Sequence, residues 1–206
     1  RWLLVGRASD TRMGGWPAPE GAWEPVALSV RSSSENILVV DRLHSRVWEL
    51  NRDNGHPVHS WSGFIDPTAV TSAGEQVWVT DRGWHRLIPC VTGESTGRFS
   101  EAIGDHGAAP GLLAGPEGCA AVSERWIFVS DADNHRIQVI GRHGISLHHW
   151  GLHAMLPRES AGRLHYPEDL VFDPVQKMVV VMEGSESRVQ YFGARHPESR
   201  PDLAEL

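Results

Sequence analysis

The stretch VSDADNHRIQVI at residues 129–140 decides the fold, because it reads as the end of one strand, a short polar loop and the start of a second strand. Related stretches lie at 40–48, 80–88 and 182–190. In every copy an acid precedes an arginine by five positions, which gives the pairs Asp41 and Arg46, Asp81 and Arg86, Asp131 and Arg136, and Glu183 and Arg188. Four copies at this spacing are the signature of a repeat architecture.

A proline marks the start of each unit. Pro25, Pro67, Pro116 and Pro167 lie 14 to 16 residues before the four acids, which are 40, 50 and 52 residues apart. After each proline comes a strand of small or aliphatic residues, then a β-branched and aromatic strand, and a third, alternating strand begins at the motif arginine. Each unit therefore predicts one antiparallel sheet.

The third unit resembles the NHL repeat, whose Asn-His-plus-apolar signature is matched by Asn134, His135 and Ile137. The match is weaker in the fourth unit, where Glu183 replaces Asp and Ser187 replaces His. NHL repeats form the blades of β-propellers. The resemblance therefore implies an all-β propeller made of four-stranded antiparallel blades.

We expect residues 1–193 to form one propeller, followed by a C-terminal extension at 194–206. The four units of the propeller are expected at about 25–61, 67–103, 116–150 and 167–193. The fourth unit lacks an outer strand, because the chain after it is polar and broken by prolines. Residues 2–6 resemble the ends of outer strands, so we expect 2–5 to lie alongside 188–192 and to close a ring of four blades.

The alternative is that the chain belongs to a larger NHL propeller, for example a six-bladed one. NHL propellers commonly have more than four blades, and the chain does not begin with Met, so we expect that residues before it were removed or not included. In the second unit, Pro89 predicts a bent or short third strand, and 99–103 is the expected outer strand.

Composition excludes several classes of protein. The 206 residues include 19 Lys and Arg against 26 Asp and Glu, and the net charge of −7 disfavours a nucleic-acid or anionic-membrane partner. The longest apolar run, 178–182, is too short to span a bilayer, so no membrane insertion is expected. The two cysteines form no CxxC pair that could hold zinc or an iron–sulfur cluster.

One side of the predicted propeller is the expected binding face. The loops between second and third strands share this side with the connections between units, which contain the long insertions at 7–24, 62–66, 105–115 and 152–166. The candidate binding residues are Trp16, Trp23, Arg42, Arg82, Trp84 and Asn134. Trp16 and Trp23 are either exposed anchors for a partner or a plug folded over the channel mouth.

The recurring acid and arginine have a simpler structural explanation. A carboxylate at this position can accept N–H groups of the loop, while the arginine bridges to a neighbouring carbonyl or carboxylate. His85 and His135, directly before the arginine, are expected to pack and to form hydrogen bonds. Neighbouring strand residues point to opposite faces, so pairs such as His148 and His149 cannot share an ion, and neither a metal nor a cofactor is expected.

Three functions remain open at this stage. The preferred one is a non-catalytic module or scaffold that binds protein partners, as a domain or subunit of a larger assembly. An enzyme of the metal-dependent lyase or hydrolase type is the first alternative, but the expected inner strands contain no histidine and the sequence has no nucleophile or phosphate-loop motif, so no catalytic residue is assigned. RNA binding is the second, and it is disfavoured by the acids in the same loops.

Overall fold

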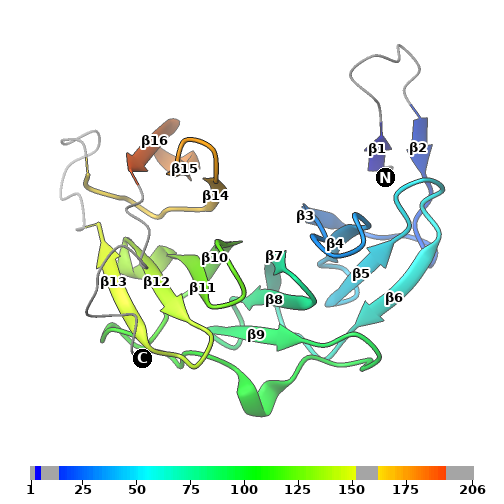
Figure 1. Cartoon of the computed structure of the whole chain (residues 1–206), viewed down its shortest axis with the longest axis horizontal. Helices are drawn as coiled ribbons and strands as arrows, with labels where there is room; N and C mark the ends of the chain where they lie inside the picture. Colours follow the sequence, from blue (N-terminus) through cyan, green and yellow to red (C-terminus); the bar gives the residue numbers. More distant parts are fainter. Residues whose placement is uncertain (1–2, 6–13, 152–161, 194–206) are drawn as a thin grey trace.

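The structure, a computed structural model, describes residues 3–5, 14–151 and 162–193. These residues form an all-β arc in which antiparallel sheets stand around a common centre like the blades of a propeller (Figure 1). This confirms the predicted fold class. The described residues include no helix that is long and apolar enough to cross a membrane.

Two of the sheets have four strands each. Blade A contains β3 (Pro25–Val30), β4 (Ile37–Asp41), β5 (Arg46–Leu50) and β6 (Pro57–Trp61), and blade C contains β10 (Pro116–Ala121), β11 (Trp126–Asp131), β12 (Arg136–Gly141) and β13 (Ser146–Trp150). The strands pair in sequence order, so each blade is a meander that runs from the centre of the arc to its rim.

Two sheets have three strands in the described part of the chain. Blade B contains β7 (Pro67–Ala73), β8 (Gln76–Asp81) and β9 (Arg86–Cys90), and blade D contains β14 (Asp169–Asp173), β15 (Met178–Glu183) and β16 (Arg188–Gly193). In all four blades the motif acid pairs directly with the motif arginine, for example Asp131 with Arg136. The repeat in the sequence is therefore a repeat in strand register.

The core lies between neighbouring blades. One face of blade A packs Leu38, Val47 and Trp61 against Val79 and Ile88 of blade B. Comparable clusters fill the seams between blades B and C and between blades C and D. Fully burying one such side chain contributes about 1.5–3 kcal/mol, so the apolar alternation of the second and third strands is what stacks the blades.

The outer strand predicted at 99–103 is wrong. Residues Phe99–Glu101 form the 3-10 turn η1, and only Ile103 forms a bridge, with Leu87. The β9 strand is a regular five-residue strand, so Pro89 does not shorten it. On the outer side of β9, the carbonyl of Pro89 accepts a hydrogen bond from Arg98 N–H, but the proline nitrogen has no hydrogen to donate in return. Blade B therefore keeps its third strand and has no regular fourth strand among the described residues.

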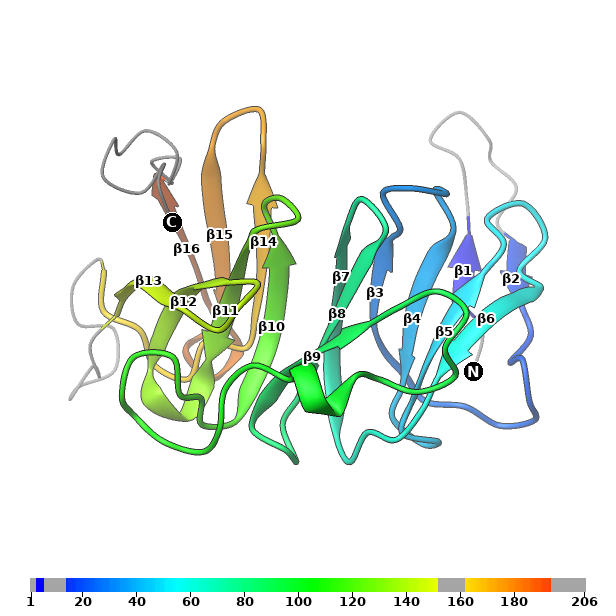
Figure 2. The same cartoon turned by 60° about the horizontal axis from the view of Figure 1, so that its bottom comes forward.

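The predicted closure of the ring is also wrong. The strand β1 (Leu3–Val5) pairs with β2 (Gly14–Trp16) and not with β16. The resulting hairpin stands beside blade A, at the opposite end of the arc from blade D (Figure 2). A partner strand only nine residues along the chain costs far less loop entropy than one at the far end of the sequence. The described residues therefore form an open arc of four blades.

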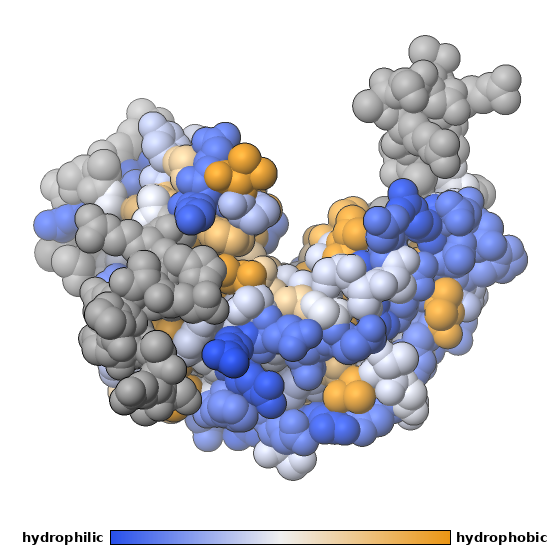
Figure 3. All heavy atoms as spheres, in the orientation of Figure 1, coloured by the Kyte–Doolittle hydropathy of each residue, from blue (hydrophilic) through white to orange (hydrophobic). Residues whose placement is uncertain are grey.

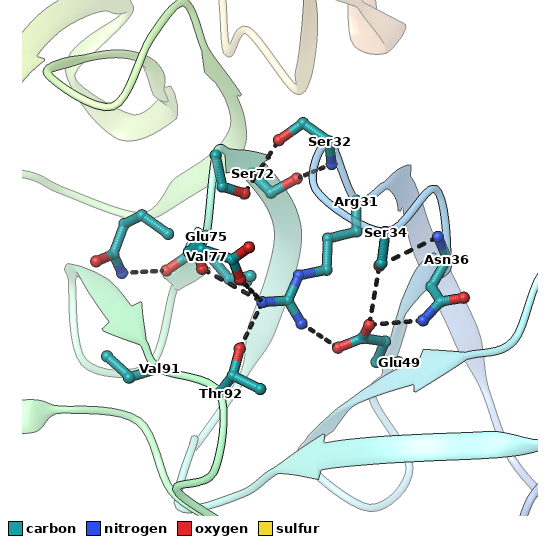
Figure 4. A network of polar contacts seen from close by, with 12 residues as sticks. Arg31, Ser32, Ser34, Asn36, Glu49, Ser72, Glu75, Val77, Val91 and Thr92 are labelled. Atoms are coloured by element: carbon teal, nitrogen blue, oxygen red, sulfur yellow. Dashed lines mark hydrogen bonds and ion pairs between the residues drawn. The ribbon is translucent and has the colours of Figure 1, made fainter.

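A polar network joins blades A and B at the strand ends opposite the motif loops (Figure 4). The guanidinium of Arg31 is buried, forms an ion pair with Glu49 of its own blade, and donates to the carbonyl of Glu75 and to Thr92 of the next blade. Ser34 and Asn36 donate to the remaining oxygen of Glu49. This seam is therefore fixed by directional bonds in addition to apolar packing.

Candidate functional site

The motif loops lie next to the loops that enter each blade. Arg42 N–H donates to the carbonyl of Glu24, Arg82 N–H to that of Asp66, and Asp133 N–H to that of Ala114. The side of the arc expected to bind partners is therefore made of two layers of loops that share backbone hydrogen bonds.

Blade C shows how the motif acid is held. Asp131 is fully buried, and its Oδ1 accepts the N–H of Ala114 at 2.6 Å. Its Oδ2 accepts from Arg136 Nε at 2.7 Å, Asn134 Nδ2 at 2.9 Å and Gln138 Nε2 at 3.0 Å. Four donors around one carboxylate provide the compensation that a buried charge requires.

Arg136 extends this network into the insertion at 105–115. Its terminal nitrogens donate to the carbonyls of Ala108, Ala109 and Leu112 at 2.8–3.1 Å. Asn134 Nδ2 also donates to the carbonyl of Gly107. One arginine thus closes its own blade and fastens the inserted loop to it.

The same arrangement recurs with variations. In blade D, Glu183 accepts from His165 N–H and twice from Arg188, while Arg188 also donates to the carbonyl of Arg163. Asp41 accepts from Glu24 N–H, His44 and Trp48, and Asp81 from the N–H groups of Ile65, Asp66 and Trp84. In these two blades the arginine turns outward instead, with Arg46 near Glu20 and Arg86 near Asp105.

These bonds shift the pKa values of two motif acids. Burial raises the pKa of Glu183, but the hydrogen bonds from Arg188, Gln190 and His165 N–H outweigh burial and hold it below its usual range. Burial likewise raises the pKa of Asp41, and Glu24 N–H, His44 and Trp48 more than reverse that effect. Both groups are therefore held as carboxylates at neutral pH.

The residue before each motif arginine has left-handed backbone geometry, with φ of 48–55° at Ser45, His85, His135 and Ser187. Three of these side chains reach the loop that enters the next blade. Ser45 Oγ donates to the carbonyl of Ile65, His85 Nδ1 accepts Gly115 N–H at 3.0 Å, and His135 Nδ1 accepts Tyr166 N–H at 3.2 Å. This position therefore joins successive blades.

An exposed apolar patch, called the docking patch after the role proposed for it below, lies over blades A and B on this side. We define it as the exposed apolar side chains Leu43, Ile65 and Trp84, which come from three neighbouring loops. Ile65 sits against Gly83, where a Cβ atom would lie only 2.5 Å from its side chain. The ring of Trp84 leans on Phe99, with centroids 6.3 Å apart.

Ion pairs surround the docking patch. Arg42 lies 3.3 Å from Asp66, and Arg82 pairs with Glu117 and, at 3.5 Å, with Asp133. Burial raises the pKa of Glu117 above its usual value, although Arg82 and Arg42 oppose the shift. Because each arginine faces acids, the surface around the patch is of mixed sign. Figure 3 shows the opposite face of the arc, where apolar and polar residues are also interspersed.

The expected binding residues do not all meet at this patch. Arg42, Arg82 and Trp84 do, whereas Asn134 is engaged with Asp131 and Gly107. Trp23 is buried and Trp16 is half-buried, in a cluster with Trp48 on the flank of blade A. Both side chains cover the apolar flank of blade A. Neither tryptophan is therefore an exposed anchor or a plug of the channel.

The concave side of the arc is a poor catalytic site. The four inner strands line a cavity of about 480 Å³ in which apolar side chains predominate, and the only carboxylate lining it is Asp169. Burial raises the pKa of Cys119, on the same wall, to about 12, so its thiolate is not available at neutral pH. Within the described ranges, no three His, Cys, Asp or Glu side chains are placed to share a metal ion.

The sequence analysis missed several participants. Gln138 and Gln190, each two positions after the motif arginine, donate to the motif acid and to an insertion carbonyl. Their shared place in the repeat is a signal that could have identified them. Leu43 and Ile65 carry no such signal, since an exposed apolar residue in a loop cannot be recognised before its neighbours are placed.

No known family profile matches the chain, and no curated protein matches it in sequence. Solved structures do. The chain superposes on the β-propeller domain of Myceliophteria thermophila Cps50 (Swd1) with a TM-score of 0.64 and 11% identity, covering 94% of this chain and 63% of that one. A chain of a nidogen/laminin complex gives a TM-score of 0.68 and 14% identity, covering 90% of this chain and 66% of that one.

Kuenenia stuttgartiensis hydrazine synthase gives a TM-score of 0.58 at 9% identity, covering 82% of this chain and 49% of that one. This chain thus spans less than two thirds of the length of each of the three. At these identities the similarity establishes the fold, a β-propeller, and leaves the function to the residues of this chain.

Proposed function

We propose that this chain is an NHL-type propeller that serves as a protein-interaction module within a larger assembly, and that it binds through the docking patch of Leu43, Ile65 and Trp84. The observation that carries the proposal is the exposure of these three side chains together on loops that hydrogen bonds hold in place. An apolar centre rimmed by charged pairs is the usual composition of a protein–protein interface.

The surrounding charges favour a protein partner over RNA. Arg42 and Arg82 lie in the same loops as Leu43 and Trp84, and acids accompany both arginines. A phosphate backbone would have to compete with these acids for the two arginines, which weakens RNA binding. A protein surface can instead meet acid and arginine together, with Trp84 as an anchor.

The NHL assignment rests on Asn134, His135 and the acid–arginine pair. Each side chain has a role that explains its place in the motif: Asn134 and Arg136 bind Asp131 and the inserted loop, and His135 binds the next blade. A propeller enzyme is the less favoured function, because the cavity along the inner strands supplies one carboxylate and a thiol of raised pKa.

The test is a pull-down with the chain as bait, with partners identified by mass spectrometry and their Kd values then measured. We expect Leu43→Ala combined with Trp84→Ala to weaken binding at least about tenfold, since interface anchors contribute about 1–2 kcal/mol or more each. The matched control replaces Val58 and Ile145, which are equally exposed on other surfaces, by alanine.

The control variant should bind normally, and both variants should keep the wild-type melting temperature. Equal binding by the patch variant and the wild type would contradict the proposal. Partners that disappear after nuclease treatment, or between 50 and 200 mM salt, would instead indicate nucleic acid.

A further inference from the structure

The two ends of the arc expose side chains whose equivalents are buried in the other blades. At the blade D end, Val189 follows the motif arginine and is 61% exposed. Its counterparts Val47, Leu87 and Ile137, which also follow the arginine in their blades, are each 0% exposed because the next blade covers them. The outward face of blade D therefore presents the same kind of apolar residue that is packed between the other blades, but no neighbouring blade covers it among the described residues.

The blade A end shows the same contrast on the opposite face. Leu28 pairs with Val39, which lies two positions before the motif acid, and Leu28 is 61% exposed. Val70, Cys119 and Leu170 have the corresponding place in the other blades and are 4–6% exposed. Each of these three packs against the preceding blade, so the inner part of blade A lacks a preceding blade.

The hairpin of β1 and β2 is the outer half of such a blade. Leu3 of β1 pairs with Trp16 of β2, as Val47 pairs with Trp61 and Ile137 with Trp150, between the third and fourth strands of blades A and C. These tryptophans have the same surroundings. Trp61 packs against the second and third strands of blade B and Trp150 against those of blade D, and Trp16 packs against those of blade A.

The sequence around β1 is similar to that of a third strand. Residues 1–6 read RWLLVG, and the third strands of blades C and D read RIQVIG at 136–141 and RVQYFG at 188–193. All three begin with an arginine and end with a glycine, although strand pairing gives Leu3, two positions after Arg1, the place that Ile137 has one position after Arg136. In the described part of the chain, no strand lies along the free edge of β1, where a second strand runs in every blade.

We propose that further residues of the same polypeptide close this arc into a ring, adding an inner hairpin along β1 that buries Leu28 and a further blade that covers Val189. The solved propeller chains that contain this arc are longer than it, which leaves a third or more of their length for the gap. The missing hairpin would resemble 25–41, with a strand of small residues, a β-branched strand and a terminal acid.

The described strands of a second copy of this chain cannot supply that hairpin. The edge of β1 needs a second strand whose outer side is unpaired, but β4, β8, β11 and β15 are each paired on both sides. A second copy would have to break one of its own sheets. Addition of a strand to an open edge, with pockets for alternate side chains, is an established mode of recognition, and a different protein that used it would protect the edge only when it is present.

The test is thiol labelling of the complete polypeptide, expressed from its whole gene. Leu28→Cys and Val189→Cys place a thiol at each end of the arc, and Val58→Cys, at 56% exposure on the outer strand of blade A, is the matched control. Cys90 and Cys119, the two cysteines of the 206-residue chain, are buried and therefore contribute little background labelling. We expect a maleimide to react at positions 28 and 189 at least about tenfold more slowly than at position 58.

Equal rates at all three positions would overturn the proposal. Protection that needs a second protein, or that depends on concentration with the mass of a dimer, would overturn it as well, because the covering blades would then not belong to the same polypeptide. Hydrogen exchange of the unsubstituted polypeptide gives an independent measurement. The amides of β1 and β16 should exchange as slowly as those of β5 and β12, and fast exchange at both would contradict the closed ring.

Discussion

Blades C and D contain the same motif in the same register, yet they differ in how much of it is buried. Asp131 pairs with Arg136 and Glu183 with Arg188, and the acid is fully buried in both. The residue after the arginine is buried at Ile137 and exposed at Val189. The motif therefore forms its hairpin whether or not another blade follows. The apolar residue after the arginine, in contrast, is buried only where a neighbouring blade covers it.

The arginines differ as well. Arg136 is nearly buried and binds Asp131 and three carbonyls of the insertion, whereas Arg188 is one-fifth exposed and binds Glu183 and one carbonyl. The longer inserted loop that the structure describes before blade C supplies the additional acceptors. The connection that enters blade C is thus held to its motif arginine by more hydrogen bonds than the connection that enters blade D.

Removal of the motif acid should have the largest effect. Asp131→Ala leaves Arg136 buried without its carboxylate, and we expect the free energy of unfolding to fall by about 3–5 kcal/mol. Glu183→Ala should cost less, about 2 kcal/mol, because Arg188 is closer to solvent. Urea denaturation of both variants measures the difference, and an equal or larger loss in blade D would remove the distinction between the blades.

Truncation of the flank should separate the blades most clearly. Ile137→Ala opens a cavity in a filled seam and should cost about 2–5 kcal/mol, while Val189→Ala in the 206-residue chain should cost less than about 0.5 kcal/mol. The same denaturation experiment measures both. A loss above about 1 kcal/mol for Val189→Ala in this chain would mean that the exposed flank is already covered, for example by a second copy.

The smallest expected effect is on pH dependence. Because the folded-state pKa of Glu183 is depressed, its ionisation stabilises the fold above the ordinary glutamate pKa of about 4.3, and this contribution is lost as the pH falls through the folded value. The variant Glu183→Gln should therefore lose stability less steeply than the wild type between pH 5 and pH 3. Parallel stability curves for the two proteins would show that Glu183 is not linked to folding.

Much of the fold was predictable because it is local. The acid, the arginine and the proline recur at fixed distances, and the strands between them alternate, so both the blades and their register follow from the sequence. The ring closure was wrong because residues 2–6 were interpreted as an outer strand, whereas the pairing of Leu3 with Trp16 gives β1 the place of a third strand. A strand of that type pairs with the strand that follows it, as β1 does with β2.

The candidate site was less predictable, because it depends on contacts between loops of different blades. Trp16 and Trp23 were expected as exposed anchors or as a plug over the channel mouth, but they lie in the cluster that covers blade A. Trp84 was expected at the binding face, and its apolar neighbours Leu43 and Ile65 were not. Charge and aromatic content are visible in a sequence, whereas the exposure of an aliphatic residue depends on what the chain places over it.

The left-handed residues before the motif arginines have an energetic consequence for the whole arc. A non-glycine residue in this conformation costs about 1 kcal/mol, and the cost falls within one blade. The bonds formed by Ser45, His85 and His135 extend to the following blade, so the compensation is located in a different repeat. Each of these repeats therefore receives part of its stabilisation from the next one, which favours unfolding that spreads from an end of the array inward.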